Sequence, residues 1–373
     1  MERLSPGPGG RLRHLFLTLA GLAAALCACW SVYGCGSEAA LGTGVGDPSP
    51  PRSADIAPFP FFSPSSFWNT PPAADASIDP SSAKLVKALG AEVARELEAG
   101  SGPWINTTDY SVPIYTVPAD QATVRIRLVS SFSAPALQSA WEEVPLPSGA
   151  RPSEGSDRTL VVWQPSSDRL WEFWKLVHAT DGWQASWGGA MKNVGSNWGA
   201  YGPAAWQDAK STWGASASSF SIAGGLITLK DLQRGRIDHA LALAVPNTRT
   251  GVYASPARRT DGTSFSPASL PEGAHLRLDP KLDLATLHLP WLTAMIAEAA
   301  QRYGIFVRDK AKVAHFFAQD PRPTGANPYV GETGYFDGES PAQLLSSFPW
   351  DQLQVLWMDL HGFNPASGPG RPR

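Results

Sequence analysis

The stretch at residues 238–245, Asp-His-Ala-Leu-Ala-Leu-Ala-Val, decides the fold class. Its apolar side chains alternate in size, and successive side chains of a β-strand point to opposite faces of the sheet. One face of this strand would carry the histidine, both leucines and the valine, and we expect that face in the core. The other face would carry the aspartate and three alanines, which leaves room for a closely packed second layer or for a ligand.

Short strands separated by turns are expected on both sides of this stretch. They are rich in β-branched and aromatic residues and are bounded by Gly, Pro, Asn or Asp. The further expected strands are residues 111–117, 123–129, 159–164, 169–177, 225–229, 275–278 and 305–309. Helical spacing of apolar residues predicts one helix between Asp79 and Gly100 and a second at 291–303.

The order of these elements predicts the fold class. Helices of the length that parallel βαβ units need are missing between the strands. The sequence therefore predicts a mainly β fold, an antiparallel sandwich or jelly roll that forms a single domain with two peripheral helices.

The composition excludes several classes of protein. The 373 residues include 15 Trp, 15 Phe and 8 Tyr, too many large apolar side chains for a disordered, collagen-like or coiled-coil chain. The 30 Lys and Arg are balanced by 33 Asp and Glu, and no basic run occurs in the body of the chain. We therefore expect no nucleic-acid partner.

The first 35 residues have the pattern of an export signal. Arg11 and Arg13 precede an apolar run at residues 15–26, which is shorter than the roughly 20 apolar residues of a membrane-spanning helix. Cys35 (or Cys29) is placed like the lipidated cysteine of a bacterial lipoprotein; an ordinary cleaved signal and an uncleaved anchor are the alternatives. We expect an exported protein, lipid-anchored in the cell envelope or extracellular, whose membrane contact is limited to this anchor or signal segment.

The rest of the chain divides by composition. Residues 36–58 are rich in Gly, Ala, Ser and Pro and are expected to be a flexible linker. Residues 59–362 are expected to form the single β-rich domain, and residues 363–373 a disordered tail. No cysteine follows Cys35, which excludes a disulfide or a Cys-ligated metal within that domain.

Tryptophan is concentrated in the middle third, where 8 of the 15 lie between residues 163 and 213. Trp187 and Trp198 are followed by glycine in polar loops that stay hydrated. Flat aromatic faces stack on the C–H faces of sugar rings, so we expect these two residues, together with Asn197, to bind carbohydrate. The alternative is that they pack over the rim of the sheet.

Three residues are candidates for acid–base chemistry. Glu172 shares a strand face with Trp174 and Leu176, so burial would raise its pKa and suit it as a general acid; the alternative is a salt bridge at a strand edge. Asp157 precedes a strand and would complete the carboxylate pair of a glycosidase, or else stabilise a turn. His239 lies near the edge of the leucine face, where it would be a catalytic base or a hydrogen-bonded core histidine.

Other charged residues are candidates for ligand binding. Arg258 and Arg277 would pair bidentately with a carboxylated sugar if they lined a groove, although ordinary surface charge explains them equally well. Asp238 lies on the alanine face, where a ligand has room. The sequence contains no Gly-rich phosphate loop, no His-x-x-x-His pair and no Gly-x-Ser-x-Gly, so we expect neither a metal nor another cofactor.

Eight short motifs follow one another between residues 67 and 321. They are Phe-Trp-Asn-Thr at 67–70, Glu-Gly-Ser-Asp at 154–157, Leu-Trp-Glu at 170–172, Gly-Gly-Leu at 224–226, Gly-Arg-Ile-Asp-His-Ala-Leu at 235–241, Pro-Ala-Arg at 256–258, Pro-Glu-Gly-Ala-His-Leu-Arg-Leu at 271–278 and Arg-Tyr-Gly-Ile at 302–305. In this order they resemble a family of uncharacterised secreted bacterial proteins that often accompany polysaccharide-active modules. The resemblance implies export and extracellular work but no defined reaction. Gln184 and Arg259 stand where the family pattern has histidine.

Two functions follow from these features. The first is an exported cell-envelope protein that binds an extracellular polysaccharide and has no assigned activity. The second is a polysaccharide-degrading enzyme. A hydrolase would use Glu172 as acid with Asp157 as its carboxylate partner, and a lyase would use His239 as base with Arg258 or Arg277 neutralising a uronate.

Overall fold

The computed structural model describes residues 61–364. The expected signal (1–35), the linker (36–58) and most of the expected tail (363–373) lie outside the described residues, so export and lipidation at Cys35 or Cys29 stay predictions. All described residues belong to one compact unit. Within this range no helix is long and apolar enough to cross a bilayer.

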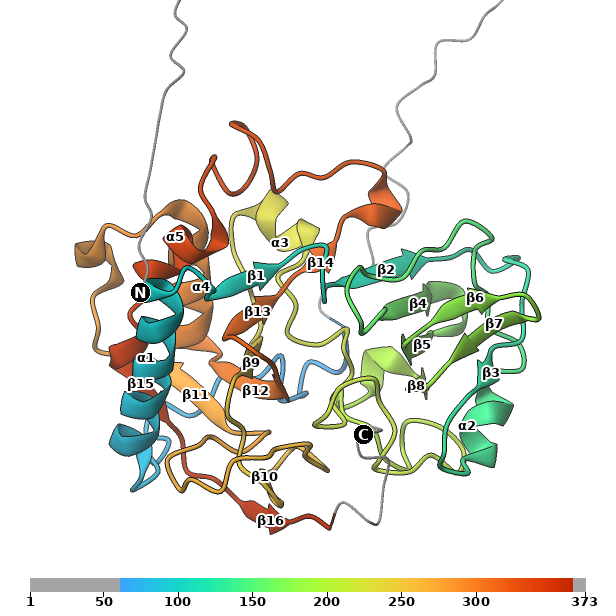
Figure 1. Cartoon of the computed structure of the whole chain (residues 1–373), viewed down its shortest axis with the longest axis horizontal. Coiled ribbons are helices and arrows are strands. Elements are labelled where there is room, and N and C mark those ends of the chain that lie inside the picture. The colour runs from blue at the N-terminus through green and yellow to red at the C-terminus, as the bar shows by residue number, and fades with distance from the viewer. Residues whose placement is uncertain (1–60, 365–373) are drawn as a thin grey trace, which may run out of the picture. The chain divides into compact units, whose positions relative to one another are not determined.

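Residues 61–364 form five α-helices and sixteen strands (Figure 1). The helices are α1 (Ser82–Glu98), α2 (Pro135–Ala140), α3 (Leu229–Arg234), α4 (Trp291–Arg302) and α5 (Pro341–Ser346). The strands are β1 (Trp104–Asn106), β2 (Val112–Thr116), β3 (Arg127–Leu128), β4 (Leu160–Gln164), β5 (Arg169–Trp174), β6 (Val177–Ala179), β7 (Gly182–Ala185), β8 (Trp187–Lys192), β9 (Leu241–Val245), β10 (Val252–Ala254), β11 (His275–Leu278), β12 (Ile305–Lys310), β13 (His315–Phe317), β14 (Gln319–Asp320), β15 (Leu353–Val355) and β16 (Leu360–Gly362).

The architecture is mixed α/β, with several sheets. The expected antiparallel sandwich or jelly roll is not confirmed, because both larger sheets contain parallel pairs: β9 with β12, and β2 with β4. Parallel neighbours need a long crossover connection, and α4 lies in the connection between β9 and β12. The two expected helices are present as α1 and α4, and three short helices join them in the described range.

The six-stranded sheet, in the order β1-β13-β9-β12-β11-β15, has a largely aliphatic core. The alternation expected for residues 238–245 is confirmed in β9. Leu241 and Leu243 belong to a buried cluster with apolar residues of α1 and α4. Ala242 and Ala244 belong to a second cluster, in which Trp68 is buried. The small alanine face therefore accommodates a second layer.

The five-stranded sheet, in the order β14-β2-β4-β5-β8, has an aromatic core. Trp141, Trp163, Trp171 and Phe173 are all buried in its cluster. A separate three-stranded sheet, β3-β7-β6, also belongs to this part of the chain.

Two of the connections between the larger sheets are short. The chain passes from β1 to β2 and, farther on, from β13 to β14 (Figure 1). β1 pairs in parallel with β13, and β2 pairs in parallel with β14. The segments that join these strands therefore lie where the two sheets meet, and polar side chains there can face a cavity without entering either core.

Candidate functional site

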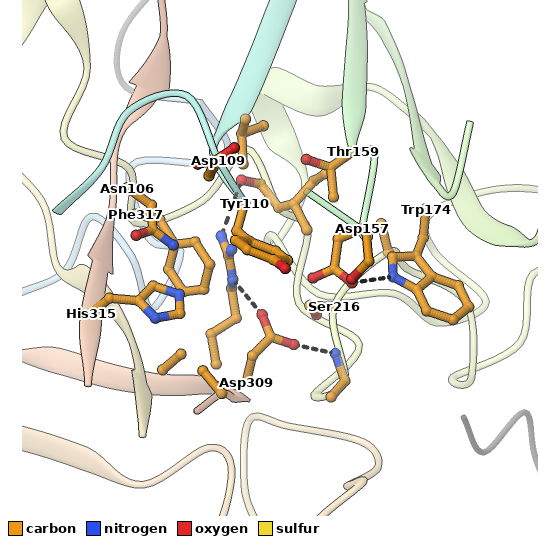
Figure 2. Close-up of a pocket in the computed structure, with 18 of the residues that line it drawn as sticks. Asn106, Asp109, Tyr110, Asp157, Thr159, Trp174, Ser216, Asp309, His315 and Phe317 are labelled. Carbon is orange, nitrogen blue, oxygen red and sulfur yellow. Dashed lines mark hydrogen bonds and ion pairs between the residues drawn. The ribbon is translucent and has the colours of Figure 1, made fainter. Parts of the chain in front are cut away.

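A cavity of about 1320 Å³ is lined by strands of both larger sheets. Loops at residues 107–110, 129–132, 156–157, 215–217 and 259–261 complete its wall. Figure 2 shows Asn106, His315 and Phe317 on one side of the cavity and Asp157, Thr159 and Trp174 on the other. The two sheets supply different chemistry to these two sides.

The six-stranded sheet supplies a buried ion pair through an irregularity in β12. The register of β12 against β9 shifts between Val307 and Asp309, so that Arg308 is an extra residue. Such a bulge interrupts the alternation of side chains along a strand. As a result, Arg308 and Asp309 both line the cavity although they are neighbours in sequence.

The Arg308–Asp309 pair is held from several directions. Arg308 Nε donates to Asp309 Oδ2 at 2.9 Å, and its Nη1 donates to the carbonyl of Ile222 at 3.2 Å. The guanidinium carbon lies 3.4 Å from the centre of the Phe317 ring. Asp309 Oδ1 accepts a hydrogen bond from the backbone N–H of Ala217 at 2.6 Å. Burial lowers the pKa of Arg308, and the negative charge of Asp309 opposes this shift.

His315 of β13 carries an acceptor atom that has no hydrogen-bond partner within the described residues. Its Nδ1 lies 3.2 Å from the carbonyl of Val313, and because a carbonyl only accepts, Nδ1 carries the proton. Nε2 is then a bare acceptor, and it is buried without a partner. Burial lowers the pKa of His315 to about 4, and the charge of Arg308 acts in the same direction. The imidazole is therefore neutral at physiological pH.

The five-stranded sheet supplies an aspartate fixed by a tryptophan. Trp174 Nε1 donates to Asp157 Oδ1 at 3.1 Å, and the backbone carbonyl of Asp157 accepts from Lys175 N at 2.7 Å. The ammonium of Lys175 lies 4.3 Å from the centre of the Trp174 ring. Both Asp157 and Trp174 line the cavity.

Partly exposed aromatic side chains also line the cavity. Trp104, Tyr110 and Phe132 are each more than a third exposed, and all three belong to the lining. Tyr110 packs closely over Gly155, whose φ is +80°. A Cβ at residue 155 would lie 2.8 Å from Tyr110 Cζ, so glycine is needed there both for its backbone conformation and for this contact.

Glu172 lies beneath the cavity wall and is not part of its lining. It is fully buried and accepts hydrogen bonds from Ala215 N at 2.7 Å, Ser221 Oγ at 2.7 Å and Ile222 N at 3.0 Å. Burial raises its pKa to about 7, and the hydrogen bonds oppose this shift. Because Ala215 and Ile222 line the cavity, Glu172 holds the loop that forms part of the wall.

Arg259 is buried in the lining and holds the same loop. Its Nη2 donates to the carbonyl of Gly214 at 3.0 Å and to that of Ser216 at 2.5 Å. Burial lowers its pKa to about 10, opposed by the nearby carboxylates of Glu272 and Asp309. It therefore stays charged, and it is part of the cavity lining.

His239 and Asp238 lie outside the cavity lining. His239 is buried, with Nδ1 2.8 Å from the carbonyl of Ala240 and Nε2 3.3 Å from Asp231 Oδ2. Asp238 pairs with Arg234 at 2.6 Å and Arg236 at 2.8 Å. The structure therefore does not bring Asp157, Glu172 and His239 into one cavity, and the surroundings of His239 are those of a hydrogen-bonded core histidine.

The two arginines expected to bind a carboxylate also lie outside the lining. Arg277 is buried and donates to Gln354 Oε1 at 3.3 Å and to the carbonyl of Ala73 at 3.2 Å. Arg258 is exposed, and its backbone N–H donates to the carbonyl of Ser218 at 3.0 Å.

The structure separates the two tryptophans that were expected to bind sugar. Trp187 lines the cavity but is only 6% exposed, and its Nε1 donates to the carbonyl of Thr212 at 3.0 Å. Trp198 is 49% exposed, lies outside the lining and contacts Phe67. Asn197 is buried and stabilises its own turn, accepting from Gly199 N at 3.2 Å.

Sequence reasoning missed the Arg308–Asp309 pair and His315. A signal was available for the first: two charged residues directly follow the apolar run Ile305–Val307 of an expected strand. In a regular strand Arg308 and Asp309 would point to opposite faces of the sheet, and no feature of the sequence marks the bulge. The solitary His315 between apolar residues has no local signature.

Within residues 61–364 no group of three or more His, Cys, Asp or Glu side chains could hold a metal ion. Comparison with protein-family models, with curated proteins and with solved structures found no match for this chain.

Proposed function

We propose that the protein is exported and binds an extracellular carbohydrate in the cavity between its two larger sheets. The observation that carries this proposal is the combination of a cavity of about 1320 Å³ with partly exposed aromatic side chains and hydrogen-bonding groups in one lining. Aromatic faces stack on the C–H faces of sugar rings, and polar groups fixed in advance set the orientation of a ligand. The volume exceeds that of a typical small-molecule site, which suits an oligosaccharide segment.

Two kinds of lining residue would contact the ligand, aromatic rings and polar groups. Tyr110 and Trp104 offer partly exposed rings for stacking. Asp157, Asn106 and His315 offer acceptors, and Asn106 also offers amide donors, for sugar hydroxyls. Because Asp157 is fixed by Trp174, it loses little conformational freedom when a ligand binds.

The test compares two exposed aromatic residues, one inside the cavity lining and one outside. Calorimetric titration of the full-length protein with cellohexaose, mannohexaose, xylohexaose and chitohexaose identifies which of these oligosaccharides binds. We expect Tyr110→Ala to weaken that binding at least tenfold and Trp198→Ala to leave it unchanged. Absence of binding to every glycan, or loss of binding in Trp198→Ala alone, would reject the cavity as the site.

Hydrolysis is a second candidate function, favoured by one observation. The carboxylates of Asp157, which precedes the five-stranded sheet's β4, and of Asp309, in β12 of the six-stranded sheet, line the same cavity. In a glycosidase one carboxylic acid protonates the leaving oxygen while the other carboxylate activates water, so that the glycosidic C–O bond breaks and a C–O bond to the water oxygen forms. Asp309 takes the place of Glu172 as the partner of Asp157, because Glu172 lies beneath the cavity wall and Asp309 lines the cavity.

Release of reducing ends from the bound glycan tests hydrolysis. Asp157→Asn and Asp309→Asn should each abolish turnover, whereas Asp238→Asn, outside the cavity, should not change it. Turnover that survives both cavity variants would reject this pair of carboxylates.

Export is tested separately from binding. If the N-terminal segment is a lipoprotein signal, Cys35→Ser should abolish incorporation of labelled palmitate while Cys29→Ser retains it. The reverse result would assign the lipid to Cys29, and an unlabelled wild-type protein in the medium would indicate an ordinary cleaved signal.

A further inference from the structure

We infer that the cavity selects an uncharged sugar over a uronic acid, and that His315 Nε2 accepts a hydrogen bond from one of the sugar's hydroxyls. This inference rests on the proposed carbohydrate binding and adds the class of ligand and one residue that recognises it.

The charge of the cavity lining favours a neutral ligand. Five carboxylates, Asp109, Asp157, Asp261, Asp309 and Glu339, face four cationic side chains, Arg259, Arg308, Lys310 and Lys312. The lining therefore has no excess of positive charge. A uronate would lose its hydration on entry without gaining a surplus cation, and its carboxylate would meet like charges.

Three of the four cations in the lining, Arg308, Arg259 and Lys310, already donate hydrogen bonds to groups of the protein. Arg308 donates to Asp309 and to the carbonyl of Ile222. Arg259 donates to two loop carbonyls. Lys310 Nζ donates to the carbonyl of Asp261 at 3.1 Å and to Thr263 Oγ1 at 3.3 Å. A ligand carboxylate would have to compete with these partners, which also hold the wall in place.

His315 offers a hydrogen-bond acceptor to a sugar hydroxyl. The hydrogen bond between Nδ1 and the carbonyl of Val313 fixes the tautomer, and the ring edge packs against Phe317 with 4.6 Å between the ring centres. Nε2 is thus a buried acceptor with no hydrogen-bond partner in residues 61–364, on a residue that lines the cavity (Figure 2). A buried polar atom without a partner is unfavourable, and a sugar hydroxyl supplies the donor that it lacks.

Matched sugars test the charge preference. Cellohexaose and the β-1,4-linked glucuronic acid hexamer differ only at C6, as do mannohexaose and the mannuronic acid hexamer. We expect the neutral member of the pair that binds to bind at least tenfold more tightly. Tighter binding of a uronate that Tyr110→Ala abolishes would overturn this inference and leave the proposed function standing; absence of binding by all glycans would reject both.

A variant pair tests the role of His315. We expect His315→Phe to weaken binding of the neutral hexasaccharide at least tenfold, while His361→Phe, at an exposed histidine paired with Asp359, has no effect. Unchanged affinity in a folded His315→Phe protein would overturn the assignment.

A spectroscopic measurement decides the question if His315→Phe does not fold. In the full chain labelled with ¹⁵N-histidine, the Nε2 resonance of His315 should start at the position of an unprotonated acceptor nitrogen and shift when the neutral hexasaccharide binds. A resonance that stays in place at saturation would contradict the hydrogen bond.

Discussion

The two larger sheets differ in what they bury and in what they offer to the cavity. The six-stranded sheet has an aliphatic core between strands and helices, and it contributes an ion pair and a histidine to the lining. The five-stranded sheet has a tryptophan-rich core, and it contributes Asp157 held by Trp174. The lining draws residues from both sheets, so the site lies where the two meet.

Charged groups reach the cavity in different ways on its two sides. On the five-stranded side a turn before β4 presents Asp157 directly. On the six-stranded side the bulge in β12 turns two neighbouring residues, Arg308 and Asp309, toward the cavity. Substitutions on the two sides of the cavity test this contrast.

The largest effect is expected for Glu172→Leu in β5. Leucine leaves the buried donors of Ala215, Ser221 and Ile222 without an acceptor, which should lower the free energy of unfolding by about 3–5 kcal/mol. In Glu96→Leu, in α1, a single backbone donor of the described residues, Ala314 N, loses its acceptor, and the loss should be about 1–3 kcal/mol. Denaturant unfolding measures both, and equal losses would contradict the special role of Glu172.

The second effect concerns pH. Burial raises the pKa of Glu172 from 4.5 to about 7, so the native state binds more protons than the unfolded state between these values. The free energy of unfolding should therefore fall as pH rises through this window, by about 3 kcal/mol from this group. Glu96 shifts in the same direction, to about 7, so the two contributions must be separated.

Subtracting a Glu172→Gln variant separates them. The difference in unfolding free energy between wild type and Glu172→Gln should change with pH from 5 to 8, while the remaining slope of the variant reports Glu96 and other groups. A pH-independent difference would show that Glu172 titrates near its ordinary pKa.

The third effect concerns the contact of Tyr110 with Gly155. Alanine at residue 155 must adopt φ of +80° and would clash with the tyrosine ring, so Gly155→Ala should cost about 1–2 kcal/mol and weaken glycan binding. Gly149→Ala, where an added Cβ meets no atom within 4 Å, is the control. Equal unfolding midpoints for the two variants would contradict the packing argument.

The smallest effect is expected for Trp174→Phe. Phenylalanine keeps an aromatic ring but loses the Nε1 hydrogen bond to Asp157, worth about 1 kcal/mol. Affinity for the bound hexasaccharide should fall about three- to tenfold by calorimetry. An unchanged affinity would mean that Asp157 does not need this hydrogen bond to bind ligand.

Regular periodicity made part of the fold predictable. The alternation at residues 238–245 correctly separated the faces of β9, and apolar spacing found α1 and α4. The expected strand at 225–229 was wrong, because Thr228 caps α3, with Asp231 completing a capping box. Parallel pairing was not predictable, since it depends on which strands meet across long connections.

Less of the site was predictable. Asp157 was named from its place before a strand, and it lines the cavity. Trp187 was named as a residue of a hydrated loop; it also lines the cavity, but it begins β8 and is buried. Arg308, Asp309 and His315 were missed because a β-bulge and an unpartnered nitrogen are properties of three-dimensional packing. Trp198 was chosen because its loop had to stay hydrated, but exposure to water does not place a side chain in a cavity.

Hydrogen–deuterium exchange of the full chain, with and without saturating cellohexaose or mannohexaose, tests most directly that the cavity binds the glycan. We predict slower exchange at residues 107–110, 156–157 and 215–217, which line it. Protection confined to residues 197–202, around Trp198, would contradict the account.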